Sequence, residues 1–245
     1  MDALPPFASV LLIALLPAAG NLIGAFGAEA IRVSARTLGI LLHGAAGVAI
    51  AVVGVEILPR VLPQLSLWWF VPAVCLGAVA SVGLARGVVN STAGLERRHA
   101  RAWMVYLTVA ADLLSDGLMV GVGFTVSAGL GLLLGLAQIF ANLPGGFVAG
   151  ANLRDKRVSR RTRLLAAICF PLPALIGATL GYRLLRDAPT ELSHAALAFT
   201  ASVLLLTTIE DLVPEADEPR APRRATSFAF TVGFVFFAIL SLSID

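Results

Sequence analysis

The chain has 245 residues, of which 58% are hydrophobic and 13% are charged, and its mean hydropathy is +0.89. A soluble domain carries roughly twice that share of charged residues, because its surface must face water. The composition therefore excludes an ordinary soluble domain and favours a protein that lies in a lipid bilayer. The two cysteines, Cys75 and Cys169, lie in separate apolar stretches. They predict neither a disulfide framework nor a zinc site, and we expect no resident cofactor.

Eight apolar stretches are long enough, at about 20 residues each, to cross a bilayer as α-helices. In chain order they are Phe7–Ala30, Thr37–Leu58, Leu67–Leu84, Trp103–Val126, Leu130–Leu153, Leu164–Leu185, Leu192–Val213 and Ser227–Ile244. The first has no basic residue before it and is too long for the apolar core of a cleaved signal peptide, so we expect it to stay in the mature protein. The connections are too short to hold a soluble domain. The sequence thus predicts an all-α polytopic membrane protein in which residues 1–245 form one domain.

The basic residues are distributed unevenly between the two sides of these spans. The connections after the first, third, fifth and seventh spans hold 15 of the 18 Lys and Arg residues, and the other side holds only Arg60, Arg183 and Arg186. Because basic residues stay in the cytoplasm, this bias predicts that both termini lie outside. The sequence pI of about 9.4 therefore reflects topology, and we expect no nucleic-acid partner. We expect the protein in a bacterial inner (plasma) membrane.

Two acidic residues lie near the middle of the fourth span. Asp112 and Asp116 are four residues apart, so they share one face of a helix. An Asp at the centre of a membrane helix costs about 2.5–3.5 kcal/mol on insertion scales, and two carboxylates at low dielectric do not both ionise easily. No Lys or Arg lies near the middle of any span. The pair therefore indicates a bound cation, or else protons shared between carboxyl groups that are hydrogen-bonded to neighbouring backbone.

The fifth span adds two amide side chains, also one turn apart. Gln138 and Asn142 are followed by Pro144, which removes a backbone donor and is expected to kink the helix and free carbonyl groups. An amide in a membrane helix commonly serves as a contact between helices. Irregular backbone at membrane depth, however, is tolerated where it lines a cavity, and broken helices are where transporters bind ions. We therefore predict that the two amides face the aspartate pair as further oxygen ligands.

Further acids lie nearer the membrane surfaces and complete a weak internal repeat. Glu56 closes the second span, and Glu210 and Asp211 close the seventh. Both segments show an acid-x-x-Pro pattern on helices that run in opposite directions, and the motifs of spans four and five are related in the same way. Inverted repeats with a site at the midplane are a recurrent plan of transporters. Glu56, the central pair and the inner acids are thus predicted to form a cation path, although each terminal acid is equally compatible with an ordinary interfacial position.

The chain resembles the ZIP family of divalent metal transporters. The resemblance rests on eight spans with both termini outside, a basic connection between spans three and four, and the motifs of spans four and five. The family motif H-N-F-x-D-G corresponds to Asp112 through Gly117, and the motif H-E-x-P-E-G corresponds to Ala141 through Gly146. The ends of spans two and seven are also similar to family patterns. The resemblance implies metal transport through an inverted-repeat bundle.

The departures from these motifs concern the metal ligands. Asp112 stands where the family has His, Ala141 replaces the His of span five, and Gly145 replaces an acid. The resemblance therefore implies that the family's two-metal centre is lost and that one oxygen-lined site remains. His43, His99 and His194 do not reach the midplane by spacing. Met119, close to Asp116, could add a thioether, although its pattern is more typical of packing.

From these observations we expect a divalent cation transporter of elevator or rocking type, with its site between spans four and five. The predicted ligands are Asp112, Asp116, Asn142, Gln138, Glu56, Glu210 and Asp211. The many glycines of these two spans would allow close helix contact and sliding. The expected partners are the metal ion, the bilayer and a second copy in a homodimer. Two alternatives remain open at this point: a protein of the same fold with another substrate or no transport, and an intramembrane enzyme that uses the aspartate pair as acid and base.

Overall fold

The computed structural model describes residues 6–92 and 97–244, and the side chains of all of these except 97–102. His99 and the basic residues Arg97, Arg98 and Arg101 therefore have side chains outside the described part. Every regular element in the described ranges is helical, and eight helical segments are long and apolar enough to cross a membrane. The prediction of an all-α polytopic fold with eight spans is confirmed.

The spans comprise thirteen consecutive elements. They are α1 (Pro6–Ala30), α2 (Ala35–Ala51), η1 (Val52–Ile57), α3 (Leu58–Val61), α4 (Leu67–Thr92), α5 (Arg97–Val126), α6 (Ala128–Asp155), α7 (Arg160–Ile168), α8 (Pro171–Leu185), α9 (Thr190–Thr207), η2 (Thr208–Leu212), α10 (Val213–Asp217) and α11 (Arg223–Ile244). Three spans begin at a serine that caps the helix: Ser34, Ser127 and Ser159 each accept a hydrogen bond from the backbone N–H three residues later. Such caps satisfy N–H groups that the first turn leaves free.

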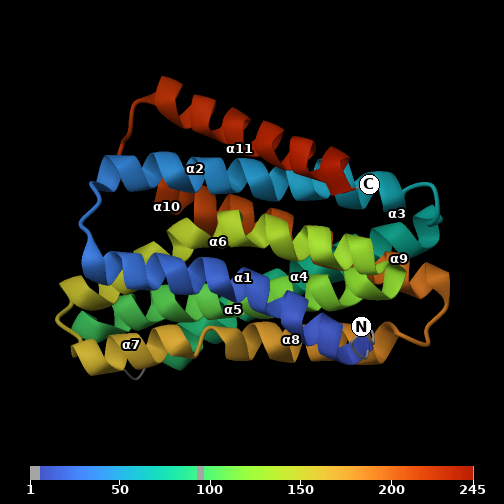
Figure 1. Cartoon of the computed structure of the whole chain (residues 1–245), viewed down its shortest axis with the longest axis horizontal. Helices are drawn as coiled ribbons and strands as arrows, with labels where there is room; N and C mark the ends of the chain where they lie inside the picture. The colour runs from blue at the N-terminus through green and yellow to red at the C-terminus, as the bar shows by residue number, and fades with distance from the viewer. Residues whose placement is uncertain (1–5, 93–96, 245) are drawn as a thin grey trace, which may run out of the picture.

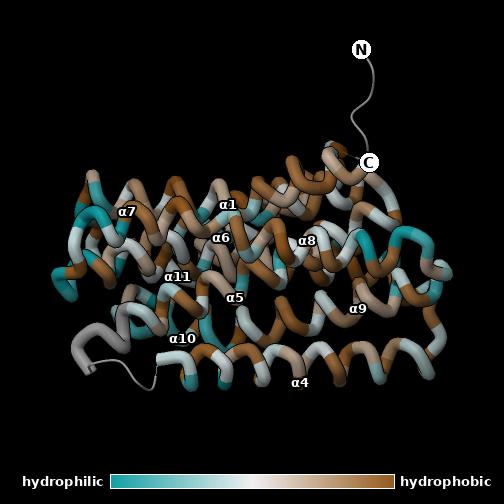
Figure 2. The backbone as a smooth tube through the Cα atoms, turned by 90° about the horizontal axis from the view of Figure 1, so that it is seen from below, coloured by the Kyte–Doolittle hydropathy of each residue, from teal (hydrophilic) through white to brown (hydrophobic). Residues whose placement is uncertain are grey.

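The helices run lengthwise through one bundle, with the connections at its two ends (Figure 1). The helices α1, α4, α6 and α10 finish at the same end of the bundle. We call it the basic end, because the residues there include Arg32, Arg36 and the basic residues between Arg154 and Arg163. The opposite end, where α1 begins and α11 finishes, is the terminus end. Figure 2 shows apolar residues along the length of the helices and hydrophilic ones gathered mainly toward the ends. This distribution is that expected of a protein whose middle faces lipid.

Four helices form a central bundle, and two helix pairs flank it. Within the bundle, α1 packs chiefly against α6, α5 chiefly against α8, and α5 also against α6. One flanking pair is α2 with α11, which lie side by side along one edge in Figure 1. The other is α4 with α9. The helices α2 and α9 connect the pairs to the bundle, because α2 packs on α6 and α9 packs on α5.

This packing has the symmetry of an inverted repeat. The helices correspond in four pairs: α1 with α8, α2 with α9, α4 with α11 and α5 with α6. When the members of each pair are exchanged, every main contact becomes either another main contact or, for α5 with α6, itself. The helices exchanged in this way run in opposite directions through the bundle. The inverted-repeat arrangement predicted from the sequence is therefore confirmed by the helix packing.

The second and seventh spans share a wider helical turn at equivalent places. The segments η1 and η2 are π-helical, and each is followed directly by a short helix with proline at its start, Pro59 or Pro214. Proline has no N–H and clashes with the carbonyl four residues earlier, so it normally ends or kinks a helix. The π-helical turn changes the hydrogen-bond register and lets both helices continue, to Val61 and to Asp217. The predicted span ends at Leu58 and Val213 are therefore too early, as is Leu84 for α4, which continues to Thr92.

Glycines hold the helix pairs together by backbone contact. A Cβ added at Gly117 would run into the backbone of Ala174 on α8, and one at Gly146 would run into the backbone of Asn21 on α1. Gly47 and Gly77 make equivalent contacts within the flanking pairs, to α11 and α9. The glycines of α5 and α6 that make close contacts thus lie inside the central bundle, and they fix its helices to one another. The expectation of close helix contact at these glycines agrees with this packing, and the expected sliding stays a prediction.

We predict that Gly177→Ala lowers the thermal stability of the purified protein, because the new methyl group would meet the backbone of Leu114 and Leu118. Overpacking of this kind costs about 1–3 kcal/mol. The matched control is Gly83→Ala on α4, where no atom beyond the adjoining backbone of its own helix lies within 4 Å of the added Cβ and alanine favours the helix. Thermal unfolding in detergent measures both variants. Equal melting temperatures for the two would contradict the proposed role of the close contacts.

Candidate functional site

A small polar cavity lies in the middle of the bundle, between α1, α5, α6 and α9. Its volume is about 60 Å³, enough for an ion or one to two water molecules. The polar side chains that line this central cavity are Asn21, Asp112, Ser115, Asp116, Gln138, Asn142, Thr200, Thr207 and Thr208. Every one of these supplies an oxygen atom, and no basic side chain is among the lining residues.

The carboxylate of Asp116 joins α5 to α6. The side chain is buried, and its Oδ1 accepts a hydrogen bond of 2.8 Å from Nε2 of Gln138, while its Oδ2 accepts one of 2.7 Å from Nδ2 of Asn142. Asn142 also reaches the carbonyl of Pro17 on α1 at 3.3 Å. The amides of α6 thus face one of the two aspartates, Asp116, through their nitrogen atoms. Their predicted role as oxygen ligands stays a prediction. The helix α6 continues through Pro144 from Ala128 to Asp155 without interruption.

Asp112 lies one turn closer to the basic end and is less enclosed than Asp116. No hydrogen bond to its carboxylate is present in the described part of the chain. It lines the central cavity and also two larger cavities, of about 250 Å³ and about 410 Å³. Its carboxylate thus stands where the central cavity borders the space toward the basic end.

Asn21 of α1 is a site residue that the sequence reasoning missed. Its side chain is 2% exposed, it lines the central cavity, and its Oδ1 is buried without a hydrogen-bond partner. An acceptor left in this state costs about 1–3 kcal/mol. The signal in the sequence was a single Asn in the middle of an otherwise apolar span.

Hydroxyl groups complete the wall of the cavity on α5, α9 and η2. Ser115, Thr200, Thr207 and Thr208 each donate a hydrogen bond to a carbonyl of their own span. Their hydrogens are therefore used within the helices, while the oxygen lone pairs remain as acceptors. These hydroxyl residues have no distinguishing signal in the sequence, because Ser and Thr are ordinary in membrane helices.

The outer acids predicted as ligands lie apart from the central cavity. Glu56 is buried on η1, with Oε1 at 2.6 Å from Arg60 and Oε2 accepting a 2.6 Å hydrogen bond from Ser241 of α11. Its carboxylate is thus neutralised and satisfied inside the α2–α11 pair, and it does not line the central cavity. The four-residue spacing of Glu56 and Arg60 was the signal for this pairing.

Glu210 and Asp211 lie on η2 and line the cavity of about 410 Å³, which also includes Asp112, Glu215 and Glu218. This acidic cavity shares Asp112, Val109, Gly145 and Leu212 with the central cavity. The two acids therefore border the space between the central cavity and the basic end, and they do not reach the central cavity themselves.

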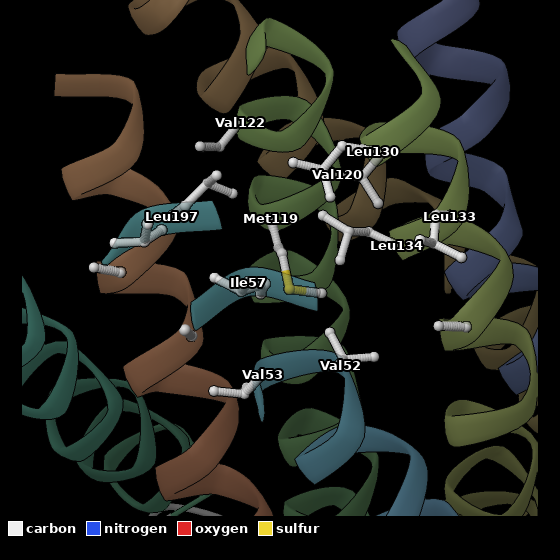
Figure 3. Close-up of a cluster of buried hydrophobic side chains, with 14 of the residues drawn as sticks. Val52, Val53, Ile57, Met119, Val120, Val122, Leu130, Leu133, Leu134 and Leu197 are labelled. Atoms are coloured by element: carbon white, nitrogen blue, oxygen red, sulfur yellow. The ribbon is translucent and has the colours of Figure 1, made fainter. Parts of the chain in front are cut away.

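Toward the terminus end the central cavity is closed by packed apolar side chains. The chain directions place Val52, Val53 and Ile57 of η1, Met119, Val120 and Val122 of α5, Leu130, Leu133 and Leu134 of α6, and Leu197 of α9 on this side. Figure 3 shows these side chains pointing into the space between their helices, with the thioether of Met119 reaching toward η1. Met119 is 1% exposed and also lines the cavity. The interpretation of Met119 as a packing residue is thus supported, although its side chain also borders the central cavity.

No His or Cys of the described residues lines the central cavity. Within residues 6–92 and 97–244, no group of three or more His, Cys, Asp or Glu side chains is arranged to hold a metal ion. His43 bonds to the carbonyl of Gly39 and to Asp217, and His194 bonds to the carbonyl of Thr190. Neither lines the central cavity. The residues that converge there are two carboxylates, three amides and hydroxyl groups.

Comparison with known protein families identifies the part of the chain that carries most of the central cavity. The family model described as ZIP Zinc transporter matches residues 86–241, which include all of α5, α6, α8 and α9. A search of individually curated proteins gave no match. The family match covers more than half of the chain and contains both carboxylates and two of the three amides of the central cavity. The chain belongs to the ZIP zinc transporter family, whose members carry divalent metal ions across membranes and are not enzymes.

Proposed function

We propose that this protein moves a divalent metal cation through an oxygen-lined site between α5 and α6. The observation that carries the proposal is the carboxylate pair in a cavity without a basic side chain. Two carboxylates this close at low dielectric need protons or a cation to balance their charge. A divalent cation balances both, and carboxylate, amide and hydroxyl oxygens are the ligands that hard divalent ions take.

The asymmetry of the surroundings supports transport rather than static binding. Acidic residues line the space between the site and the basic end, whereas packed apolar side chains close the terminus end. An ion at Asp112 and Asp116 would thus reach one side only, as alternating access requires. The glycine contacts fix α1, α5, α6 and α8 to one another. We infer that this bundle moves as one unit against the flanking pairs, by an elevator or rocking motion.

The orientation follows from the distribution of charge. The basic end carries most of the Lys and Arg residues of the chain, so we propose that it faces the cytoplasm and that both termini lie outside. The open acidic cavity would then face the cytoplasm.

We predict that Asp112→Ala and Asp116→Ala each reduce metal uptake into proteoliposomes to background, because one remaining carboxylate cannot balance a divalent ion. Asn142→Ala should reduce uptake less, since it removes a neutral group. The matched control is Asp187→Ala, which alters an exposed acid paired with Arg186 at the terminus end and should leave uptake unchanged. Full uptake by both central variants at wild-type expression would refute the site. A wild-type protein that takes up no divalent metal would instead indicate a member of the family that does not transport.

We also predict that Mn²⁺ competes with Zn²⁺ effectively, because the converging groups offer oxygen and no nitrogen. Oxygen-rich sites suit Mn²⁺, Mg²⁺ and Ca²⁺, although zinc retains its general advantage in affinity. Asp112→His with Ala141→His should shift the preference toward zinc, and Ala141 lines the cavity, so the new imidazole would face the ion. Competition uptake with single and double variants measures the shift. If the wild type excludes Mn²⁺ and the double variant prefers zinc to the same degree, the oxygen-site argument is wrong.

A further inference from the structure

We propose that Asn21 of α1 is a direct ligand of the transported ion, so that three helices and not two hold the cation. This inference rests on the proposed function, and it adds a residue outside the segment matched by the family model. It arises from one feature of the described structure: the only buried side-chain oxygen there without a hydrogen-bond partner is Oδ1 of Asn21.

The position of this oxygen favours a ligand role over a role in packing. An Asn that joins membrane helices does so through hydrogen bonds from its amide to a neighbouring helix, as Asn142 does. Oδ1 of Asn21 makes none, although its side chain is 2% exposed and borders the central cavity with Asp116 and Asn142. The residue borders a polar cavity, and a buried acceptor requires a donor or a cation within its reach.

The neighbouring backbone fixes Asn21 and leaves space in front of it. Gly146 of α6 packs directly on the Asn21 backbone, and Gly20 and Gly24 bring α1 equally close to α6. Gly145, which also lines the cavity, has no side chain, and a Cβ there would lie 3.7 Å from Oδ1 of Asn21. The close contacts therefore hold the backbone of Asn21 in place, and the missing side chain at Gly145 leaves space beside its amide.

The charge of the site and the place of α1 in the bundle both agree with Asn21 as a ligand. The two aspartates already match the charge of a divalent ion, so a further carboxylate would leave a net negative site, whereas an amide oxygen adds coordination without charge. Both α1 and α6 belong to the central bundle. A ligand on α1 therefore stays with the aspartates when the bundle moves, and it can hold the ion throughout a transport cycle.

The test uses equilibrium binding of Mn²⁺ and Zn²⁺ to purified protein in nanodiscs, together with thermal unfolding in the absence of metal. Asn21→Leu keeps the approximate size of the side chain and removes its oxygen. We expect it to weaken metal binding by about tenfold or more, the lower end of what groups supporting a metal site contribute. It should leave the metal-free melting temperature equal to or above that of the wild type, because an unpaired acceptor has been removed.

The control is the same exchange at Asn152, an amide of α6 that donates to the carbonyl of Val148 outside the cavity; Asn152→Leu should leave metal affinity unchanged. Unchanged metal affinity in Asn21→Leu overturns the inference, whether its melting temperature falls, as for a packing role, or stays constant, as for an oxygen that only faces water. A wild-type protein that binds neither metal overturns the proposed function itself, and these two failures are therefore distinguishable.

A compensating variant gives a second, independent readout. In the Asn21→Ala background, Gly145→Asp would place a carboxylate from α6 in the space that the amide left, where the added Cβ meets no atom closer than 3.7 Å. We expect it to restore metal binding at least to the wild-type level, while Gly145→Ala in the same background should not. Failure of Gly145→Asp to raise the affinity of a folded Asn21→Ala protein would contradict an ion in this part of the cavity.

Discussion

The carboxylate of Asp116 is the group on which the centre of this molecule depends. In the apolar middle of a membrane protein a carboxylate must receive hydrogen bonds or an opposite charge. Two amides of α6 supply the hydrogen bonds, at 2.8 and 2.7 Å, and they connect the two helices that carry the site. Each amide donates through its nitrogen, and each oxygen of Asp116 accepts one of these hydrogen bonds. A carboxylate oxygen has two lone pairs, so each keeps one for an ion.

The surrounding architecture keeps this interaction in place while leaving room for motion. Gly117 and Gly146 bring α5 onto α8 and α6 onto α1 through backbone contact, and dispersion forces act strongly at such short range. The flanking pairs are held by their own contacts, including the Glu56–Arg60–Ser241 cluster within α2, η1 and α11. Rigid units with cavities between them are what an alternating-access transporter needs, and the larger cavities lie where α9, η2 and α4 meet the central bundle.

The sequence predicted the features that depend on many residues at once. Eight spans follow from hydropathy summed over about 20 residues each, and the inverted repeat appeared in two acid-x-x-Pro segments whose helices both contain a π-helical turn. The ends of those spans could not be predicted, because proline ends most helices and the π-helical register that accommodates it has no simple sequence signal. The glycines were identified as contact positions, but which helix each one meets depends on the tertiary packing.

In the candidate site, too, some residues follow from a sequence pattern and others only from the tertiary packing. Asp116, Gln138 and Asn142 were predicted as a group because each pair repeats at one helical turn, and the structure brings them into hydrogen-bond contact. Asn21 has no polar neighbour at helical spacing within its span, so only the fold reveals that it faces the same cavity. Glu56 illustrates the opposite case, since its partner Arg60 was visible four residues away and accounts for the burial of its charge without a metal.

The central claim is that one divalent ion occupies the cavity between α1, α5 and α6. Anomalous-difference maps from crystals soaked in Mn²⁺ test it most directly, because the anomalous signal locates the metal independently of the protein density. The account predicts a single peak within coordination distance of Asp112 and Asp116, with the amide of Asn142 turned to present its oxygen. A peak at another place in the bundle, or no peak in the cavity of protein shown to take up Mn²⁺, would contradict it.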